Sequence, residues 1–235
     1  MCRLNVTDIF YSLQGECVSA GRPCVFLRLA GCNVHCNWCD STYSWAKGKE
    51  MTVQEVFDIL INTYKLYDVG YLCITGGEPV LQQEELILLM RTLRNDAQFN
   101  HRDLKVGIET NGTIVFSDQF FALCQRVNHW SVECVISPKL SNAGVDPEKV
   151  KLHQCWADTD SNYVAFKFVV GSKEDIEEVA QLVEEYGLSN IWLMPLCTTP
   201  EEHLKLLPNI WKECQERNWN LSPRLQVLIG GGRGV

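Results

Sequence analysis

The sequence predicts an α/β fold, specifically a partial (incomplete) TIM-like barrel of parallel βα units. Short runs rich in β-branched residues alternate with longer segments of helical periodicity, the pattern of repeated βα units around a parallel sheet. Several of the short runs are continuously apolar, as in strands buried on both faces. A chain of 235 residues that is 46% hydrophobic can form one large core. We therefore expect a single domain spanning residues 1–235.

Seven runs have the character of strands, which is about the number that a partial barrel requires. They are residues 24–30, 71–75, 104–109, 132–136, 163–169, 190–194 and 224–229. In α/β barrels the functional side chains gather where the carboxyl ends of the strands meet. The residues that follow these runs are therefore the first candidates for a site.

Three of the intervening helices begin with a capping box, in which a hydroxyl caps the first turn and an acidic side chain reaches back to the cap. The boxes are Thr52 with Glu55, Ser172 with Asp175, and Thr199 with Glu202; the second helix ends at Gly187 and the third near residue 217. Weaker periodicity predicts helices at 81–95 and 117–127. Residues 138–162 have no periodic pattern, and we expect a functional loop there.

Composition excludes several classes of protein. The net charge of −8, from 29 acidic and 21 basic residues, lacks the positive field that nonspecific nucleic-acid binding needs. No apolar run approaches the roughly 20 residues that span a bilayer, and the first residues do not resemble a signal peptide. We therefore expect a cytoplasmic protein whose twelve cysteines are mostly reduced thiols.

A compact cysteine array follows the first predicted strand. Cys32, Cys36 and Cys39 form a C-x3-C-x2-C pattern within GCNVHCNWCD. Clustered thiolates favour an iron–sulfur cluster or zinc. A closed zinc site needs four ligands, and the chain has no second C-x2-C, although His35 is a candidate fourth ligand. Three cysteines on a cubane cluster would leave one iron open for a small molecule.

A glycine-rich turn, TGGEP at 75–79, follows the next predicted strand. Gly76 and Gly77 allow a ligand to approach the backbone closely, and the Glu78 carboxylate can accept hydrogen bonds from a cation. Since parallel strands end at one edge, we expect this turn beside the cysteine array.

These two motifs together make the chain resemble a radical S-adenosylmethionine enzyme, whose signature is a cysteine loop holding a [4Fe–4S] cluster. Within that superfamily the chain is similar to the 7-carboxy-7-deazaguanine synthases over nearly its whole length. The matching segments are YSLQGE (11–16), FLRLAGCN (26–33), CNWCDSTYSW (36–45), ITGGEP (74–79), IETNG (108–112), SPK (137–139), FKFVV (166–170), LMP (193–195) and SPRLQVL (222–228).

The resemblance implies a reaction and its cofactors. The reaction is the radical ring contraction of 6-carboxy-5,6,7,8-tetrahydropterin to 7-carboxy-7-deazaguanine with loss of ammonia, a lyase step toward queuosine and other deazapurines. A 5′-deoxyadenosyl radical from S-adenosylmethionine would take a hydrogen from the pterin C6, and its return would regenerate S-adenosylmethionine. Mg²⁺, an electron donor such as flavodoxin, and a homodimer are also implied.

The resemblance also implies roles for individual residues. The cysteines of the array would hold the cluster, and Ser41 would bind Mg²⁺. The substrate would contact Leu13, Gln14, Gly15, Arg28, Thr75 and Val235. S-adenosylmethionine and its surroundings would involve Trp38, Cys39, Asp40, Gly77, Glu78, Glu109, Ser137, Pro138, Lys139, Lys167, Met194 and Pro195.

Two of these side chains stand out on physical grounds. Arg28 and Lys167 lie inside apolar strand runs, where a buried cation must find a partner. An arginine at such a place suits a planar carboxylate. The chain departs from the family pattern near its C-terminus, where Gln226 replaces an expected histidine and Gly230 an expected aromatic residue.

Two alternative functions remain open at this point. A radical-generating activase uses a similar cysteine loop but docks a protein partner, so it has no need of SLQGE and Arg28 for a small pterin. A noncatalytic zinc module would explain the three cysteines, but not TGGEP, IETNG and SPK. A zinc module would contain one zinc per chain and no sulfide. A cluster would instead contain about four iron and about four sulfide ions per chain.

Overall fold

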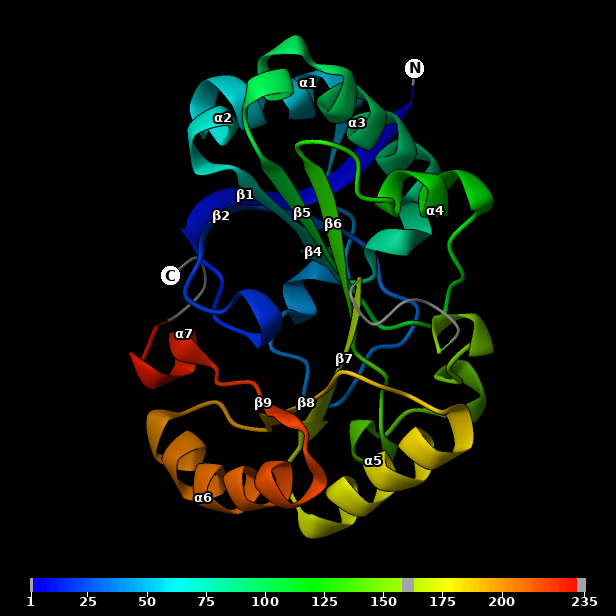
Figure 1. The fold of residues 1–235 in the computed structure, drawn as a ribbon, viewed down its shortest axis with the longest axis vertical. Helices are drawn as coiled ribbons and strands as arrows, with labels where there is room; N and C mark the ends of the chain where they lie inside the picture. Colours follow the sequence, from blue (N-terminus) through cyan, green and yellow to red (C-terminus); the bar gives the residue numbers. More distant parts are fainter. Residues whose placement is uncertain (1, 158–162, 232–235) are drawn as a thin grey trace.

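The computed structural model describes residues 2–157 and 163–231, which form an unclosed, mostly parallel barrel (Figure 1). One nine-stranded sheet runs in the order β3-β1-β2-β4-β5-β6-β7-β8-β9. Its strands are β1 (Arg3–Leu13), β2 (Pro23–Leu29), β3 (Lys49–Thr52), β4 (Tyr71–Gly76), β5 (Leu104–Thr110), β6 (Trp130–Ile136), β7 (Val164–Val170), β8 (Ile191–Pro195) and β9 (Asn220–Leu221). The expected partial barrel is confirmed.

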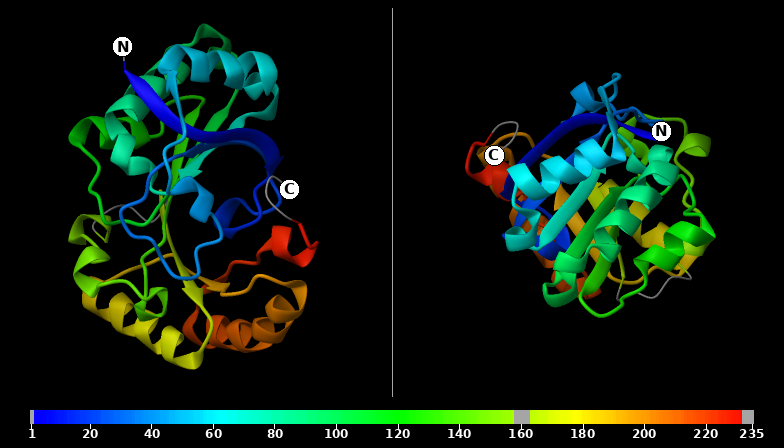
Figure 2. Two further views of the ribbon diagram at one scale, coloured as in Figure 1. Left: turned by 180° about the vertical axis from the view of Figure 1, so that it is seen from behind. Right: turned by 90° about the horizontal axis from the view of Figure 1, so that it is seen from above.

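Helices α1 to α6 of the described chain lie on the outer side of the sheet (Figures 1 and 2), whereas α7 borders the cavity. They are α1 (Val53–Asp58), α2 (Leu66–Val69), α3 (Gln83–Asn95), α4 (Asp118–Cys124), α5 (Lys173–Tyr186), α6 (Pro200–Arg217) and α7 (Leu225–Leu228). All three predicted capping boxes are formed, at the starts of α1, α5 and α6. Helix α5 ends at Gly187, which adopts the left-handed conformation that glycine accommodates.

Six of the seven predicted strands are present, as β2 and β4 to β8. The prediction of a strand at 224–229 is wrong, because Leu225–Leu228 form the short helix α7. A brief apolar run fits either structure, and here tertiary contacts decide. The amide of Leu225 donates to the Gly15 carbonyl at 3.0 Å, and the amide of Arg224 donates to His203 Nε2 at 3.1 Å.

The sequence patterns missed the antiparallel edge of the sheet. β1 pairs antiparallel with both β2 and β3, whereas the remaining pairs are parallel. Leu4 and Val6 of β1 are buried, but its residues from Thr7 to Leu13 are partly buried or exposed, and this second half of the strand has no regular alternation of apolar and polar residues. The predicted helix at 117–127 is also too long. It stops at Cys124 because Val127 and Trp130 form an antiparallel bridge around Asn128, whose φ is 50°.

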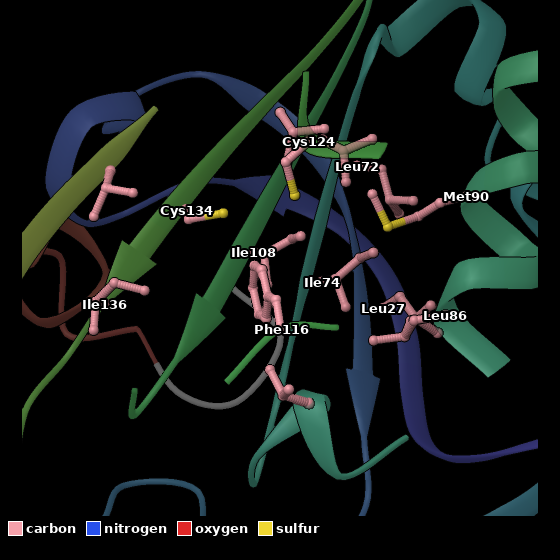
Figure 3. Close-up of a cluster of buried hydrophobic side chains, with 14 of the residues drawn as sticks. Leu27, Leu72, Ile74, Leu86, Met90, Ile108, Phe116, Cys124, Cys134 and Ile136 are labelled. Carbon is pink, nitrogen blue, oxygen red and sulfur yellow. The ribbon is translucent and has the colours of Figure 1, made fainter. Parts of the chain in front are cut away.

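The main hydrophobic core lies between the outer face of the sheet and the helices. In β4, Leu72 and Ile74 belong to this core, whereas Tyr71 and Cys73 belong to a second cluster on the other face. Figure 3 shows Leu72 and Ile74 beside Leu86 and Met90 of α3. This alternation, with a period of two residues, leaves every second side chain of each strand for the barrel interior.

The turn between β1 and β2 enters the interior of the barrel. Its Cys17 packs against Val135 of β6, Ala165 of β7 and Trp192 of β8. The Cys17 amide also donates to Ser222 Oγ at 2.7 Å. Figure 1 shows α7 beside this turn. The two ends of the unclosed sheet are therefore joined through the turn rather than by strand pairing.

The described residues between β6 and β7, up to residue 157, form irregular structure, as expected, whereas residues 158–162 of the predicted loop lie outside the described residues. Short 3₁₀ segments occur at Ser141–Ala143, Pro147–Lys149 and Gln154–Trp156. Trp156 is fully buried, and its Nε1 donates to the Gly112 carbonyl at 2.9 Å. Among residues 2–157 and 163–231, no helix combines the length and apolar character needed to cross a bilayer.

Replacing Ile74 tests the assignment of the outer core. Ile74 is fully buried, so Ile74→Ala is expected to lower the free energy of unfolding by about 2–5 kcal/mol through lost burial and a residual cavity. Urea titration followed by circular dichroism measures this change. Leu88→Ala, on the exposed side of α3 (38% exposed), is the control and should stay within about 0.5 kcal/mol of the parent chain. Equal losses in the two variants would contradict the assignment.

Candidate active site

A cavity of about 690 Å³ opens at the carboxyl ends of the parallel strands. The interior positions of four strands contribute polar side chains to its wall, namely Arg28 of β2, Thr75 of β4, Glu109 of β5 and Lys167 of β7. In β2 and β4 these polar residues follow interior apolar residues at two-residue steps, as Arg28 follows Cys24 and Phe26, and Thr75 follows Tyr71 and Cys73. The period that buries the outer core therefore also sets the polar wall of the cavity.

The cysteine array lines one side of this cavity. Cys32, Cys36 and Cys39 all reach it, and Cys36 is buried against Val34 and Ala143. The 138–157 segment supports this loop, because the Asn37 amide donates to the Ala143 carbonyl at 3.0 Å. The loop also needs the left-handed conformation of His35, whose φ is 62°.

Three thiols that line one cavity are the donor set that an iron–sulfur cluster takes, and they leave one iron open. In a cubane cluster each cysteine binds a different iron, so the cysteine sulfurs do not meet at one metal ion. Burial raises the pKa of Cys36, the nearby Lys139 ammonium opposes this rise, and the charged forms of Cys39 and Cys32 add to it. Lys139 is partly buried and lies near both Cys36 and Cys32.

The glycine-rich turn lies directly against the start of the cysteine loop. A Cβ added to Gly77 would lie 2.1 Å from the Gly31 carbonyl oxygen, so only glycine fits there. The Glu78 amide donates to that same carbonyl at 2.8 Å. The two motifs that the sequence predicts to be neighbours therefore share backbone contacts.

Glu78 itself turns away from the cavity. Its buried carboxylate accepts hydrogen bonds from Thr110 Oγ1 at 2.7 Å, the Asn111 amide at 2.7 Å and the Val80 amide at 2.9 Å. Burial raises the pKa of Glu78, and these donors oppose the rise. In this structure the carboxylate ties the glycine turn to the end of β5, behind the cavity wall.

Glu109 and Arg28 form a further polar part of the cavity wall. Glu109 Oε1 accepts from Gln14 Nε2 at 3.0 Å, and Glu109 Oε2 accepts from Thr75 Oγ1 at 2.8 Å. Arg28 lies over the rings of Phe10 and Tyr43, at 5.9 and 5.8 Å. Its buried Nε has no hydrogen-bond partner among the described residues. A buried donor of this kind suits an anionic ligand.

Glu16 is the centre of a buried ion cluster beside this wall. Its Oε2 lies 2.6 Å from Lys167 Nζ, and its Oε1 lies 3.1 Å from Arg224 Nε and 2.7 Å from Gln226 Nε2. Burial raises the pKa of Glu16, but Lys167 and Arg224 outweigh this effect and lower it from 4.5 to about 2. The Glu16 carboxylate is therefore charged at neutral pH.

Most of the predicted site residues meet in this one cavity. Those on its wall are Leu13, Gln14, Gly15, Arg28, Cys32, Cys36, Trp38, Cys39, Asp40, Ser41, Thr75, Gly77, Glu109, Ser137, Lys139, Lys167 and Met194. Glu78, Pro138 and Pro195 do not line it, and Val235 lies outside the described residues.

Sequence reasoning did not assign Glu16 or Arg224 to the wall, and it named Gln226 only as a departure from the family pattern. All three line the cavity, although Glu16 lies more than 200 positions from Arg224 and Gln226 in the chain. One signal pointed to them, since a lysine inside the apolar run FKFVV requires a buried carboxylate. Glu16 is that carboxylate for Lys167. Arg224 was not recognised because its segment, residues 224–229, has the apolar pattern of a strand.

Comparison with known proteins agrees with this geometry. The family model of the radical SAM superfamily matches residues 27–207. The 7-carboxy-7-deazaguanine synthase of Pyrobaculum aerophilum is 38% identical over 99% of this chain and 97% of that relative. The synthase of Hyperthermus butylicus is 35% identical over 96% and 92%. The fold is similar to that of QueE from Escherichia coli, with a TM-score of 0.71, 23% identity, and coverage of 96% and 95%.

The fold and the cysteine loop define the class of protein, and the chain belongs to the radical S-adenosylmethionine superfamily. Members of this class use a [4Fe–4S] cluster and S-adenosylmethionine. Within the superfamily, the chain belongs to the 7-carboxy-7-deazaguanine synthase family. This membership confirms the resemblance seen in the sequence, and it disfavours the activase and zinc-module alternatives.

Glu16→Gln tests the ion cluster. Removing this charge leaves Lys167 and Arg224 buried without their shared partner, so the free energy of unfolding near neutral pH should fall by about 3–5 kcal/mol. Because the folded pKa of Glu16 is depressed to about 2, its stabilisation is present above the unfolded pKa of about 4.5 and is lost as the pH falls toward about 2.

The measurement is denaturant unfolding of the cluster-free chain at a series of pH values. The gap between the parent chain and Glu16→Gln should narrow steadily below pH 4.5. Glu177→Gln breaks a half-exposed ion pair with Arg217 and is the control, with an expected change within about 1 kcal/mol. A gap that is independent of pH would contradict the charged state of Glu16.

Proposed function

We propose that this chain catalyses the ring contraction of 6-carboxy-5,6,7,8-tetrahydropterin to 7-carboxy-7-deazaguanine, with loss of ammonia, in queuosine or other deazapurine biosynthesis. One observation carries the proposal. The three-cysteine loop and the polar wall of Arg28, Thr75 and Glu109 face the same cavity of about 690 Å³. Membership of the synthase family supplies the reaction.

The side of the cavity near the cysteines has the groups that the cofactors require. Cys32, Cys36 and Cys39 would hold the cluster, and Gly77 with Ser137 would border S-adenosylmethionine. When bound, the reduced cluster and S-adenosylmethionine supply the 5′-deoxyadenosyl radical that takes a hydrogen from the pterin C6. The remaining walls of the cavity keep that chemistry away from bulk water.

The opposite side suits the pterin. Arg28 lines the cavity and can pair with the substrate carboxylate, and the Phe10 and Tyr43 rings beside it limit how its guanidinium can turn. Glu109 is fixed at both oxygens by Gln14 and Thr75. Its remaining lone pairs can accept from the N–H donors of the pterin.

The proposal also includes Mg²⁺, bound by Ser41. The Ser41 hydroxyl lines the cavity, 3.6 Å from Cys39 Sγ, and hydroxyl oxygen is a suitable hard ligand for an ion that keeps other positions for substrate and water. A homodimer, an electron donor such as flavodoxin, and a single radical S-adenosylmethionine domain over residues 1–235 complete the proposal.

A reducing compartment such as the cytoplasm belongs to the proposal as well. All twelve cysteines lie within the described residues, and none of them forms a disulfide. Free thiols persist where the compartment keeps them reduced.

Anaerobic reconstitution tests the function directly. The chain is loaded with iron and sulfide, then incubated with dithionite, S-adenosylmethionine, Mg²⁺ and 6-carboxytetrahydropterin, and the products are analysed by mass spectrometry. We expect 7-carboxy-7-deazaguanine, at a lower rate when Mg²⁺ is chelated. Formation of 5′-deoxyadenosine without the deazapurine would contradict the substrate, and zinc without a cluster would contradict the whole proposal.

Arg28→Gln tests recognition of the carboxylate. Loss of a charge-assisted hydrogen bond worth about 1.5–3 kcal/mol should raise KM for the pterin by roughly 10- to 100-fold, with a smaller effect on kcat. The readout is steady-state formation of the deazapurine. Arg22→Gln is the matched control, since Arg22 also lies over an aromatic ring, 5.0 Å from the centroid of Tyr71, but outside the cavity. A KM that rises equally in both variants would refute the role of Arg28.

A further inference from the structure

Arg224 joins three parts of the molecule that are distant in sequence. Its Nε lies 3.1 Å from Glu16 Oε1 in the β1–β2 turn, and its Nη1 donates to the Cys197 carbonyl at 2.5 Å. Its Nη2 contacts the Asp40 carboxylate of the cysteine loop. The side chain is only 8% exposed. This planar guanidinium therefore connects the substrate side of the cavity with the cysteine side.

The backbone of Arg224 is held as firmly as its side chain. Its amide donates to Nε2 of the fully buried His203 at 3.1 Å. Its carbonyl accepts from the amides of Val227 and Leu228 at 3.0 and 3.1 Å, within α7. Arg224 is therefore held in place and can in turn hold the more exposed cysteine loop.

Asp40 is the part of the loop that reaches this fixed point. It directly follows Cys39 and precedes Ser41, so its position determines where both side chains lie. Its own side chain is 59% exposed, and water can solvate its charge without any partner. The contact with Arg224 is therefore needed for the geometry of the loop more than for the solvation of Asp40.

We propose that Arg224 is a positioning residue that fixes the Cys39–Ser41 end of the cysteine loop, through Asp40, against the Glu16 side of the cavity. The inference rests on the proposed function only in requiring a cluster on the three thiols. An arginine is needed because one flat fork meets Glu16, Cys197 and Asp40 at once. A lysine ammonium is a single point charge that cannot span the three acceptors.

Retention of the cluster is the readout that tests the inference. Anaerobically reconstituted Asp40→Asn, Arg224→Gln, Arg224→Lys and the double variant Asp40→Asn/Arg224→Gln are challenged with an iron chelator, and loss of iron is followed by the cluster absorbance. Partners of metal ligands typically contribute about 10- to 100-fold in metal affinity. We expect each single variant to lose iron about tenfold faster or more, with no rescue by lysine.

The double variant distinguishes a shared contact from two independent effects. If Asp40 and Arg224 act through one interaction, the double variant should lose iron no faster than the faster single variant. The paramagnetic resonance spectrum of the reduced cluster should also respond differently to S-adenosylmethionine in Asp40→Asn than in the parent chain. Asp40→Asn leaves the Glu16–Arg224 contact in place, so its effect does not depend on the stability of the buried ion cluster.

Arg217→Gln is the matched control. Arg217 also bridges two carboxylates, Glu213 at 2.9 Å and Glu177 at 2.6 Å, but it lies outside the cavity. Its iron retention should equal that of the parent chain. Parent-like retention in both Asp40→Asn and Arg224→Gln would overturn this inference and leave the proposed function intact. A parent chain that binds no cluster would instead refute the proposed function.

Discussion

The buried charge of Glu16 is the constraint on which much of this architecture depends. A carboxylate removed from water must be paired, and its partners Lys167 and Arg224 lie on β7 and just before α7. The β1–β2 turn therefore has to enter the barrel, where Cys17 packs against β6, β7 and β8. The sheet does not close by strand pairing, and this ion cluster connects its two ends instead.

The same strands build the core and the site without conflict because side chains alternate along them. Outward residues such as Leu72 and Ile74 pack under α3 (Figure 3). Inward residues of β2 and β4 are apolar at first and become polar toward the ends of the strands, as in the step from Cys73 to Thr75. The residues of the main core therefore lie on the outer face of the sheet, whereas the residues that line the cavity lie on its inner face.

Residues that never touch the cavity prepare the cysteine loop. Glu78 is behind the wall and joins the glycine turn to the end of β5 through two hydrogen bonds, from Thr110 and Asn111, while Ala143 supports Asn37 from the long β6–β7 connection. Both motifs of the superfamily are therefore held by contacts within the protein itself. A preorganised site of this kind avoids the entropy cost of ordering its loops around each ligand.

Local patterns in the sequence determined six strands, the three capped helices, the cysteine array and the order of the motifs, because each depends on neighbouring residues. They also indicated that Lys167 needed a carboxylate partner. Only the tertiary structure decided that the partner is Glu16, 151 positions away, that Arg224 precedes a helix rather than lying in a strand, and that Glu78 turns away from the cavity. Those outcomes depend on pairing buried charges across segments distant in sequence, and such pairing leaves no periodic trace in the chain.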